Sequence, residues 1–182
     1  LTGPRYVLDA KWGGFYSTYA TGFATPERAV AGLGTEFFIL RSGIKPHACC
    51  RTLHSVVDAV LKIVGGAEGG AAAVEFFVVH GNEQTKLQFE RTDVHNLLEA
   101  QFSAPYCLAV AAISGRATLD QFEPLRTADP EVRRLMSATC IRTDRVLGPT
   151  DYPSLEVVFK DGRHEFLDIA FAKGAPEAPI PD

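Results

Sequence analysis

A β-hairpin signal near the C-terminal end limits most strongly how this chain can fold. Asp161-Gly162 separates two runs in which apolar and polar residues alternate, Leu155–Lys160 and Arg163–Phe171. Asp-Gly suits the tight turn between antiparallel strands, because both turn residues adopt a positive φ there. A single hairpin is only marginally stable, so the preceding sequence must supply further strands and a covering layer.

The preceding sequence carries signals for both. Runs rich in apolar, β-branched or aromatic residues predict strands at Thr35–Leu40, Ala72–His80, Thr85–Glu90 and Thr139–Asp144. Residues that commonly begin helices predict helices from Pro46 to about Val64, from Ser103 or Pro105 to Ser114, and from Asp129-Pro130 to about Ala138. We therefore predict an α+β fold, a two-layer sandwich of a mostly antiparallel sheet with helices on one face.

The chain also divides by composition. Residues 1–33 read as a loop and a broken helix, interrupted by Gly13-Gly14, and fit the two-layer scheme poorly. Residues 34–173 contain nearly all the strand and helix signals, and residues 174–182 form a Pro-rich tail. We expect an entry segment (1–33) that belongs to a different packing unit, an α+β domain (34–173) and a tail (174–182).

Charge and cysteine content exclude several classes of protein. With 18 Lys and Arg against 22 Asp and Glu, the net charge is −4, which argues against a nucleic-acid partner. The uncharged apolar stretches are far shorter than the ~20 residues of a membrane span, so no membrane partner is expected. The four cysteines form no C-x-x-C pair, which argues against structural zinc and suits a reducing, cytoplasmic compartment.

A cation stands at an unusual place in the first polar motif, Gly43-Ile-Lys-Pro-His-Ala-Cys-Cys-Arg-Thr-Leu-His54. Lys45 precedes Pro46, which pushes its backbone out of the helical region and places it at the predicted helix start. Helix N-termini already carry a partial positive charge, so a lysine there suggests that an anion binds from outside. The alternative is a cation that is merely solvated.

Four polar residues follow on one predicted helix stripe: His47, Arg51, His54 and Asp58. They could bind an anion or take part in catalysis, or they could form a solvated face with a His54–Asp58 pair four residues apart. A metal shared by the two histidines is not expected, because seven helical residues separate them by ~10 Å. The adjacent Cys49 and Cys50 could be buried small hydrophobes or a reactive thiol.

The second polar motif is Ala100-Gln-Phe-Ser-Ala-Pro-Tyr106. Ser103 and Pro105 are typical of a helix start, and Tyr106 falls in the first turn of an otherwise apolar helix. A phenol there could donate a hydrogen bond to an anion or serve as an acid or base. The alternative is an amphipathic tyrosine that seals the top of the core.

These motifs resemble the MmgE/PrpD family, which includes 2-methylcitrate dehydratase, cis-aconitate decarboxylase and iminodisuccinate epimerase. The resemblance covers most of the chain and rests on these passages: Leu1-Thr-Gly-Pro-Arg with Lys11-Trp-Gly-Gly-Phe15, the Gly43 to His54 motif with Asp58, Phe102-Ser-Ala-Pro-Tyr106 with Ala109 and Gly115, Asp129-Pro-Glu-Val, and Lys173-Gly-Ala-Pro-Glu-Ala-Pro. The chain departs from the family pattern at His47, where tyrosine is frequent, and at Lys11, where glycine is common.

The resemblance implies a two-domain enzyme with its active site between a helical domain and a smaller α+β lid domain. This chain resembles the lid with its entry segment, residues 1–33 being the end of the helical domain. By the same match, Lys45 and Tyr106 correspond to catalytic positions, and His54 to a motif residue beside them. Arg51, Ser103 and His47 join His54 as substrate-binding candidates, and neither a metal nor an organic cofactor is implied.

We therefore expect the lid domain of a cofactor-independent lyase or isomerase that acts on a small di- or tricarboxylic acid. A hydro-lyase similar to 2-methylcitrate dehydratase is the leading expectation. The expected partners are the polycarboxylate substrate, the helical domain of the same protein and a second copy in a homodimer, and the segment alone should be inactive. The alternative is a binding or interaction module that lacks catalysis.

Overall fold

The computed structural model describes residues 6–8, 10–20, 25–148 and 150–181, and the chain divides into two units, Leu1–Ser42 and Gly43–Asp182. The boundary predicted from the sequence lies after residue 33 instead. Residues 34–42 stay with the first unit because Thr35–Leu40 does not form the predicted strand; a 3₁₀ turn, η2 (Phe38–Arg41), lies there instead. An apolar run becomes a strand only where a neighbouring strand offers hydrogen bonds.

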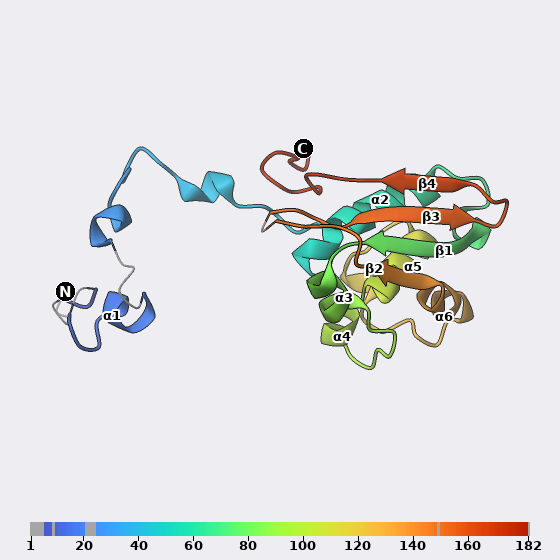
Figure 1. Cartoon of the computed structure of the whole chain (residues 1–182), viewed down its shortest axis with the longest axis horizontal. Helices are drawn as coiled ribbons and strands as arrows, with labels where there is room; N and C mark the ends of the chain where they lie inside the picture. The colour runs from blue at the N-terminus through green and yellow to red at the C-terminus, as the bar shows by residue number, and fades with distance from the viewer. Residues whose placement is uncertain (1–5, 9, 21–24, 149, 182) are drawn as a thin grey trace. The chain divides into compact units, whose positions relative to one another are not determined.

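The second unit is built on one four-stranded sheet (Figure 1). Its strands are β1 (Val74–His80), β2 (Thr139–Arg142), β3 (Ser154–Phe159) and β4 (His164–Leu167), in the spatial order β2-β1-β3-β4. β3 pairs antiparallel with both β1 and β4, whereas β2 runs parallel to β1. The mostly antiparallel sheet is confirmed. The predicted hairpin is present, but only Gly162 of its two turn residues has a positive φ, at +85°.

Helices cover one face of this sheet. They are α2 (His54–Gly65), α3 (Glu83–Phe89), α4 (Leu97–Gln101), α5 (Ala104–Ser114) and α6 (Pro130–Ser137), with 3₁₀ turns η3 (Arg51–Leu53), η4 (Gly70–Ala73) and η5 (Leu119–Gln121). Figure 1 shows α2 and α5 behind the strands, and the core joins them to the inward side chains of β1 and β3, such as Phe77 and Val157. The opposite face is more open, with Phe166 59% exposed. The α+β fold class is therefore confirmed.

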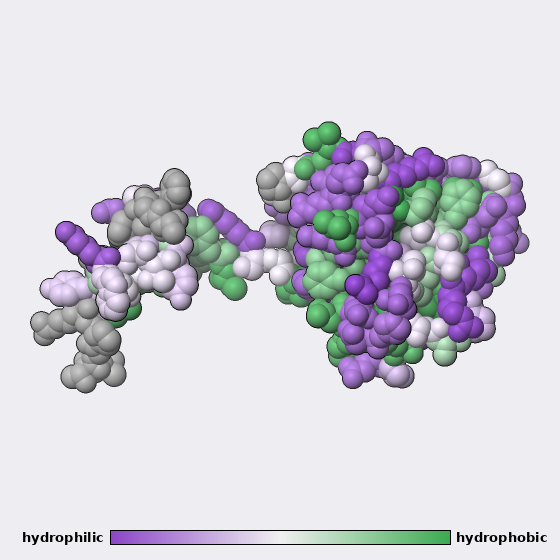
Figure 2. Space-filling view, turned by 60° about the horizontal axis from the view of Figure 1, so that its bottom comes forward, coloured by the Kyte–Doolittle hydropathy of each residue, from purple (hydrophilic) through white to green (hydrophobic). Residues whose placement is uncertain are grey.

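The helix α5 is the centre of this core. Its first eight residues, Ala104–Ala111, are all buried, and Ser103 caps its N-terminus by accepting a hydrogen bond from the Tyr106 amide at 3.1 Å. Gly115 ends the helix in the left-handed conformation, which glycine adopts without a steric penalty. The predicted bounds of this helix are confirmed. Figure 2 shows that hydrophilic side chains dominate one face of the second unit, with apolar patches between them.

Two other predictions of secondary structure are wrong. Thr85–Glu90 forms most of α3 rather than a strand, because the Asn82 side chain caps a helix by accepting from the Thr85 amide at 2.9 Å. The helix expected from Pro46 begins only at His54, after η3. In between, the backbone amides of Ala48 and Cys50 bond to distant carbonyls rather than within a helix.

The first unit has short elements, α1 (Phe15–Tyr19), η1 (Pro26–Ala29) and η2, and α1 buries none of its residues. Trp12 is 93% exposed, and Tyr19 is 75% exposed although its ring lies 5.2 Å from that of Phe15, so both aromatic side chains remain largely open to solvent. Phe23, another aromatic residue of this segment, lies outside the described residues. No described helix is both long and apolar enough to cross a bilayer.

Replacing the cap of α5 tests how strongly this fold depends on that helix. Ser103→Ala removes the acceptor for the Tyr106 amide and the donor to the Arg91 carbonyl, so we expect a loss of about 1–2 kcal/mol in unfolding free energy. Denaturant unfolding of the 182-residue chain measures it. Asn96→Ala removes the cap of the short helix α4 at an exposed site and should cost less. Equal stability of Ser103→Ala and the unmodified chain would contradict this expectation.

Candidate functional site

Lys45 is exposed on an irregular stretch, residues 43–50, which we call the Lys45 segment. Three backbone hydrogen bonds fix this segment to distant parts of the second unit: Ile44 N–H to the Gly174 carbonyl (2.8 Å), Ala48 N–H to the Ala117 carbonyl (2.8 Å) and Cys50 N–H to the Gln101 carbonyl (3.0 Å). Lys45 therefore does not stand at a helix N-terminus as predicted. It lies on a surface segment held by tertiary contacts.

The Lys45 segment and the chain around Gly174 approach so closely that only glycine fits. Gly174 has a φ of +84°, and a Cβ atom there would collide with the Ile44 carbonyl oxygen. A Cβ atom on Gly43 would lie 2.9 Å from the Gly174 carbonyl oxygen. Two glycines thus allow two backbones to pass directly beside Lys45.

A largely buried histidine–aspartate pair lies beneath this segment. His47 Nε2 donates to Asp58 Oδ1 at 2.7 Å, and the Lys173 amide donates to Asp58 Oδ2 at 2.7 Å. Burial by itself would raise the pKa of Asp58, but the hydrogen bonds from His47 and Lys173 outweigh it and hold the pKa below its usual value. The pairing differs from the His54–Asp58 pair considered above, because His47 reaches Asp58 from the irregular segment.

Arg51 and His54 lie in the same cluster, but both are engaged within the protein. Arg51 donates to the carbonyl oxygens of Ala172 (3.3 Å) and Lys173 (3.2 Å). His54 is fully buried, with its Nε2 3.4 Å from the Cys49 carbonyl oxygen and its ring centroid 5.0 Å from that of His47. The structure thus brings His47, Arg51, His54 and Asp58 together. Their hydrogen bonds mainly join separate segments of the chain.

A thiol pair completes the cluster. The nearby Cys107 and His54 side chains lower the pKa of Cys49 to about 6, although burial opposes this. Burial raises the pKa of Cys107, which lies on α5. The contact between Cys49 and Cys107 joins residues far apart in the sequence, so spacing alone offered no signal for it.

Tyr106 and Ser103 lie in the core at the start of α5. The Tyr106 hydroxyl donates to the Gln121 carbonyl at 2.8 Å and accepts from the Arg126 amide at 3.0 Å. Burial raises the pKa of Tyr106. Within the described residues no hydrogen bond joins Tyr106 to Lys45 or to the buried pair beneath it. This placement fits the interpretation of Tyr106 as a residue that seals the core, and its catalytic role stays a prediction.

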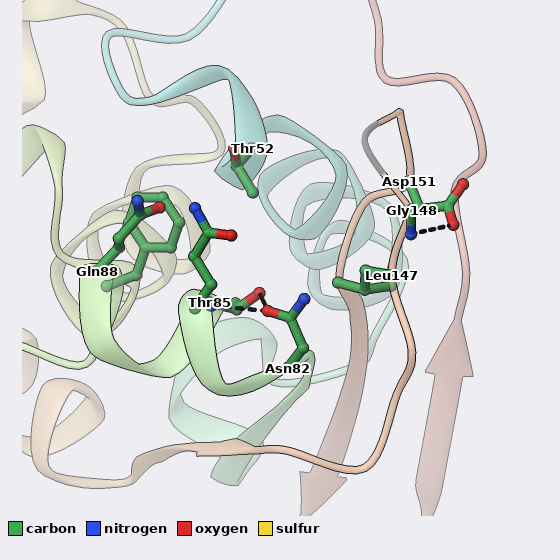
Figure 3. Close-up of a pocket in the computed structure, with 9 residues that line it drawn as sticks. Thr52, Asn82, Thr85, Gln88, Leu147, Gly148 and Asp151 are labelled. Carbon is green, nitrogen blue, oxygen red and sulfur yellow. Dashed lines mark hydrogen bonds between the residues drawn. The ribbon is translucent and has the colours of Figure 1, made fainter.

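The pocket in Figure 3 is lined by other residues than the cluster around Asp58. Its volume is about 460 Å³, and uncharged polar side chains make up much of its lining, including Thr52 on η3, Gln88 on α3 and Asn82, which caps α3. Asp151 is its one lining carboxylate and accepts from the Gly148 amide at 2.7 Å. With no cation among its lining residues, this pocket does not suit a carboxylate ligand. Among the described residues, no three His, Cys, Asp or Glu side chains are grouped to hold a metal ion.

The Cys49 thiol offers a direct test of this geometry. Ultraviolet thiolate absorbance should show a step with a midpoint near the Cys49 pKa of about 6, and Cys49→Ser should remove it. Cys107→Ala should shift the step upward, because the Cys107 side chain is the largest cause of the lowered pKa and alanine has no donor to replace it. Cys140→Ser, at an exposed thiol, should leave it unchanged. A first thiol step above pH ~8, the ordinary range, would contradict the described contacts.

Comparison with known proteins places the chain in a family. The model of the MmgE/PrpD C-terminal domain matches residues 47–182. A cis-aconitate decarboxylase-like protein, oryM, from Aspergillus oryzae is 26% identical over 196 residues. That match covers 99% of this chain but only 40% of the relative's length. Because the family model covers well over half of the residues, the chain belongs to the MmgE/PrpD family, and residues 47–182 form its C-terminal domain.

Proposed function

We propose that this chain forms the lid portion of a lyase that acts on a small di- or tricarboxylic acid. The observation that carries the proposal is the exposed Lys45, held on a fixed surface segment directly before the matched C-terminal domain. A fixed, exposed ammonium group suits a substrate carboxylate better than a neutral ligand. The family of the chain supports enzymatic lyase chemistry.

The proposed chemistry gives Lys45 a defined task. Removing a proton next to a carboxylate creates further negative charge on a substrate that is already anionic. In dehydration, a base outside this chain would take the proton, and the hydroxide would leave as water after an acid protonates it. In decarboxylation, carbon dioxide would leave its bonding electrons on the carbon, which an acid then protonates. Lys45 would stabilise the negative charge in both cases. We propose that a helical domain of the same protein supplies the main acid and base groups, and that the complete enzyme is a cytoplasmic homodimer. The exposed Trp12 and Tyr19 support further packing of the first unit.

Two reactions remain within this proposal. Dehydration of a substrate similar to 2-methylcitrate is the first candidate. Decarboxylation is the second, and the name of the Aspergillus relative favours it. The complete gene product should be assayed on a panel of polycarboxylates for both alkene formation and carbon dioxide release. Failure to turn over any member, with the protein folded, would favour the alternative of a binding module that lacks catalysis.

Lys45→Met in the complete gene product tests the proposed role of the ammonium group. We expect kcat to fall at least ~100-fold, the scale of losing one preorganised charge-stabilising group. Folding should be nearly unchanged, because Lys45 is exposed. Lys62→Met removes a matched charge at an exposed position near the end of α2 and should leave kcat unchanged. A near-normal kcat for Lys45→Met would mean that Lys45 is only a solvated cation.

Residues 1–182 by themselves should show no turnover of 2-methylcitrate, cis-aconitate or related acids. A site shared between two domains lacks both positioning and its principal acid and base groups when one domain is missing. The matched control is the complete gene product under the same conditions. Turnover by the purified 182-residue chain would defeat the proposal of a divided site.

A further inference from the structure

We infer that Asp58 is a positioning residue that fixes Lys45 in place by joining the Lys45 segment to the chain at Ala172–Gly174. The inference rests on the proposed function, in which Lys45 binds and stabilises an anionic substrate. Asp58 itself is not placed at the substrate. Its carboxylate acts through the two chain segments that it holds together.

The argument begins with the two oxygens of Asp58. Oδ1 accepts from His47, two residues after Lys45, and Oδ2 accepts from the Lys173 amide, both at 2.7 Å. Short hydrogen bonds to a carboxylate are stronger than those between neutral groups. Asp58 stands on α2, whose neighbouring residues Val57 and Ala59 are buried in the core. One rigid helix therefore holds both segments through a single side chain.

A further contact closes these bonds into a ring. The Gly174 carbonyl, next to Lys173, accepts the Ile44 amide at 2.8 Å, and Ile44 is bonded covalently to Lys45. Starting from Lys45, the ring passes through His47, Asp58, Lys173 and Gly174 and returns through Ile44. A residue inside such a ring cannot shift its backbone without breaking one of the contacts.

Arg51 strengthens the same ring from a second direction. Its guanidinium donates to the carbonyl oxygens of Ala172 and Lys173, while Asp58 takes the Lys173 amide. The chain at Ala172–Gly174 is therefore held both through a backbone amide and through backbone carbonyl oxygens. The Asp58 side chain is only 14% exposed, and both His47 and His54 lie close to it.

The chain contains a second histidine–aspartate pair, at a more exposed site, that serves as a control. His80 Nδ1 donates to Asp144 Oδ2 at 2.7 Å, the same distance as in the His47–Asp58 pair. His80 ends β1, and its neighbours in the sheet register, Arg142 and Ser154, place this pair at the strand ends rather than beside Lys45. Asp144→Asn therefore removes the same chemical contact without touching the ring.

Hydrogen exchange of the 182-residue chain tests the ring without any assay of activity. Asp58→Asn should speed exchange of the Ile44 and Lys173 amides by about tenfold or more, because these amides are freed by local opening. Asp144→Asn should leave both rates unchanged. Unchanged exchange in Asp58→Asn would overturn the inference even if the proposed function is correct.

A second variant covers the case in which Asp58→Asn does not fold. Gly174→Ala keeps every charge but forces a Cβ atom against the Ile44 carbonyl oxygen. It should speed exchange of the Ile44 amide while leaving α5 amides protected. Gly115→Ala, also at a positive φ but with open space around it, controls for backbone strain. Protection of Ile44 equal to that of the unmodified chain would overturn the inference.

Kinetics of the complete gene product test whether the ring acts through Lys45. Asp58→Asn should lower kcat about 10-fold or more, yet add little further loss when Lys45→Met is already present, because residues that act as a unit are not additive. Multiplicative losses would overturn the positioning role. If the unmodified enzyme has no activity on any polycarboxylate, the proposed function fails while the exchange result still decides whether Asp58 holds the segment.

Discussion

Burial of α5 is the constraint on which the rest of this structure depends. The helix places eight consecutive residues in the core, where α2 and the sheet pack against it. α2 in turn carries Asp58, and Cys107 of α5 contacts Cys49 of the Lys45 segment. The exposed Lys45 is thus connected to the hydrophobic core through two short paths. Surface chemistry on this domain depends on the packing of a helix that has no exposed polar face.

The two histidine–aspartate pairs show how burial changes the contribution of the same contact to stability. Both have a 2.7 Å separation, but the Asp58 side chain is 14% exposed and that of Asp144 is 43% exposed. An exposed pair is screened by water and contributes little to stability, whereas a buried carboxylate must keep its partners or its charge becomes costly. The buried pair is therefore the one able to hold two segments of chain in a fixed relation.

Local sequence signals predicted the parts of the fold that depend on local chemistry. Asp161-Gly162 determined a hairpin turn, and Ser103 and Gly115 marked the ends of α5, because caps and turns use neighbouring atoms. The helix predicted from Pro46 failed for the opposite reason. Carbonyls of Gln101 and Ala117 bind the amides of Cys50 and Ala48, and no local pattern could reveal partners more than 50 residues away. Asn82 is a local signal for the start of α3, but the β-branched and aromatic residues that follow it favour a strand.

The candidate site shows the same division between local and tertiary information. Helical periodicity grouped His47 with Asp58, and the two do meet, but through an irregular segment that folds back onto α2. The grouping was right because both residues border one surface, and the geometry behind it was wrong. For Tyr106 the sequence left two interpretations open, and the buried hydroxyl satisfies the Gln121 carbonyl and the Arg126 amide.

Any contact between that hydroxyl and a substrate must compete with these two hydrogen bonds, and leaving a buried backbone group unpaired costs about 1–3 kcal/mol. Lys45 faces no such competition, because its ammonium group is already exposed and its backbone is already fixed. Of the two residues that the family resemblance singles out, Lys45 can therefore meet an anion without rearrangement, whereas Tyr106 first has to exchange its partners. A catalytic role for Tyr106 would require the complete enzyme to reorganise the start of α5.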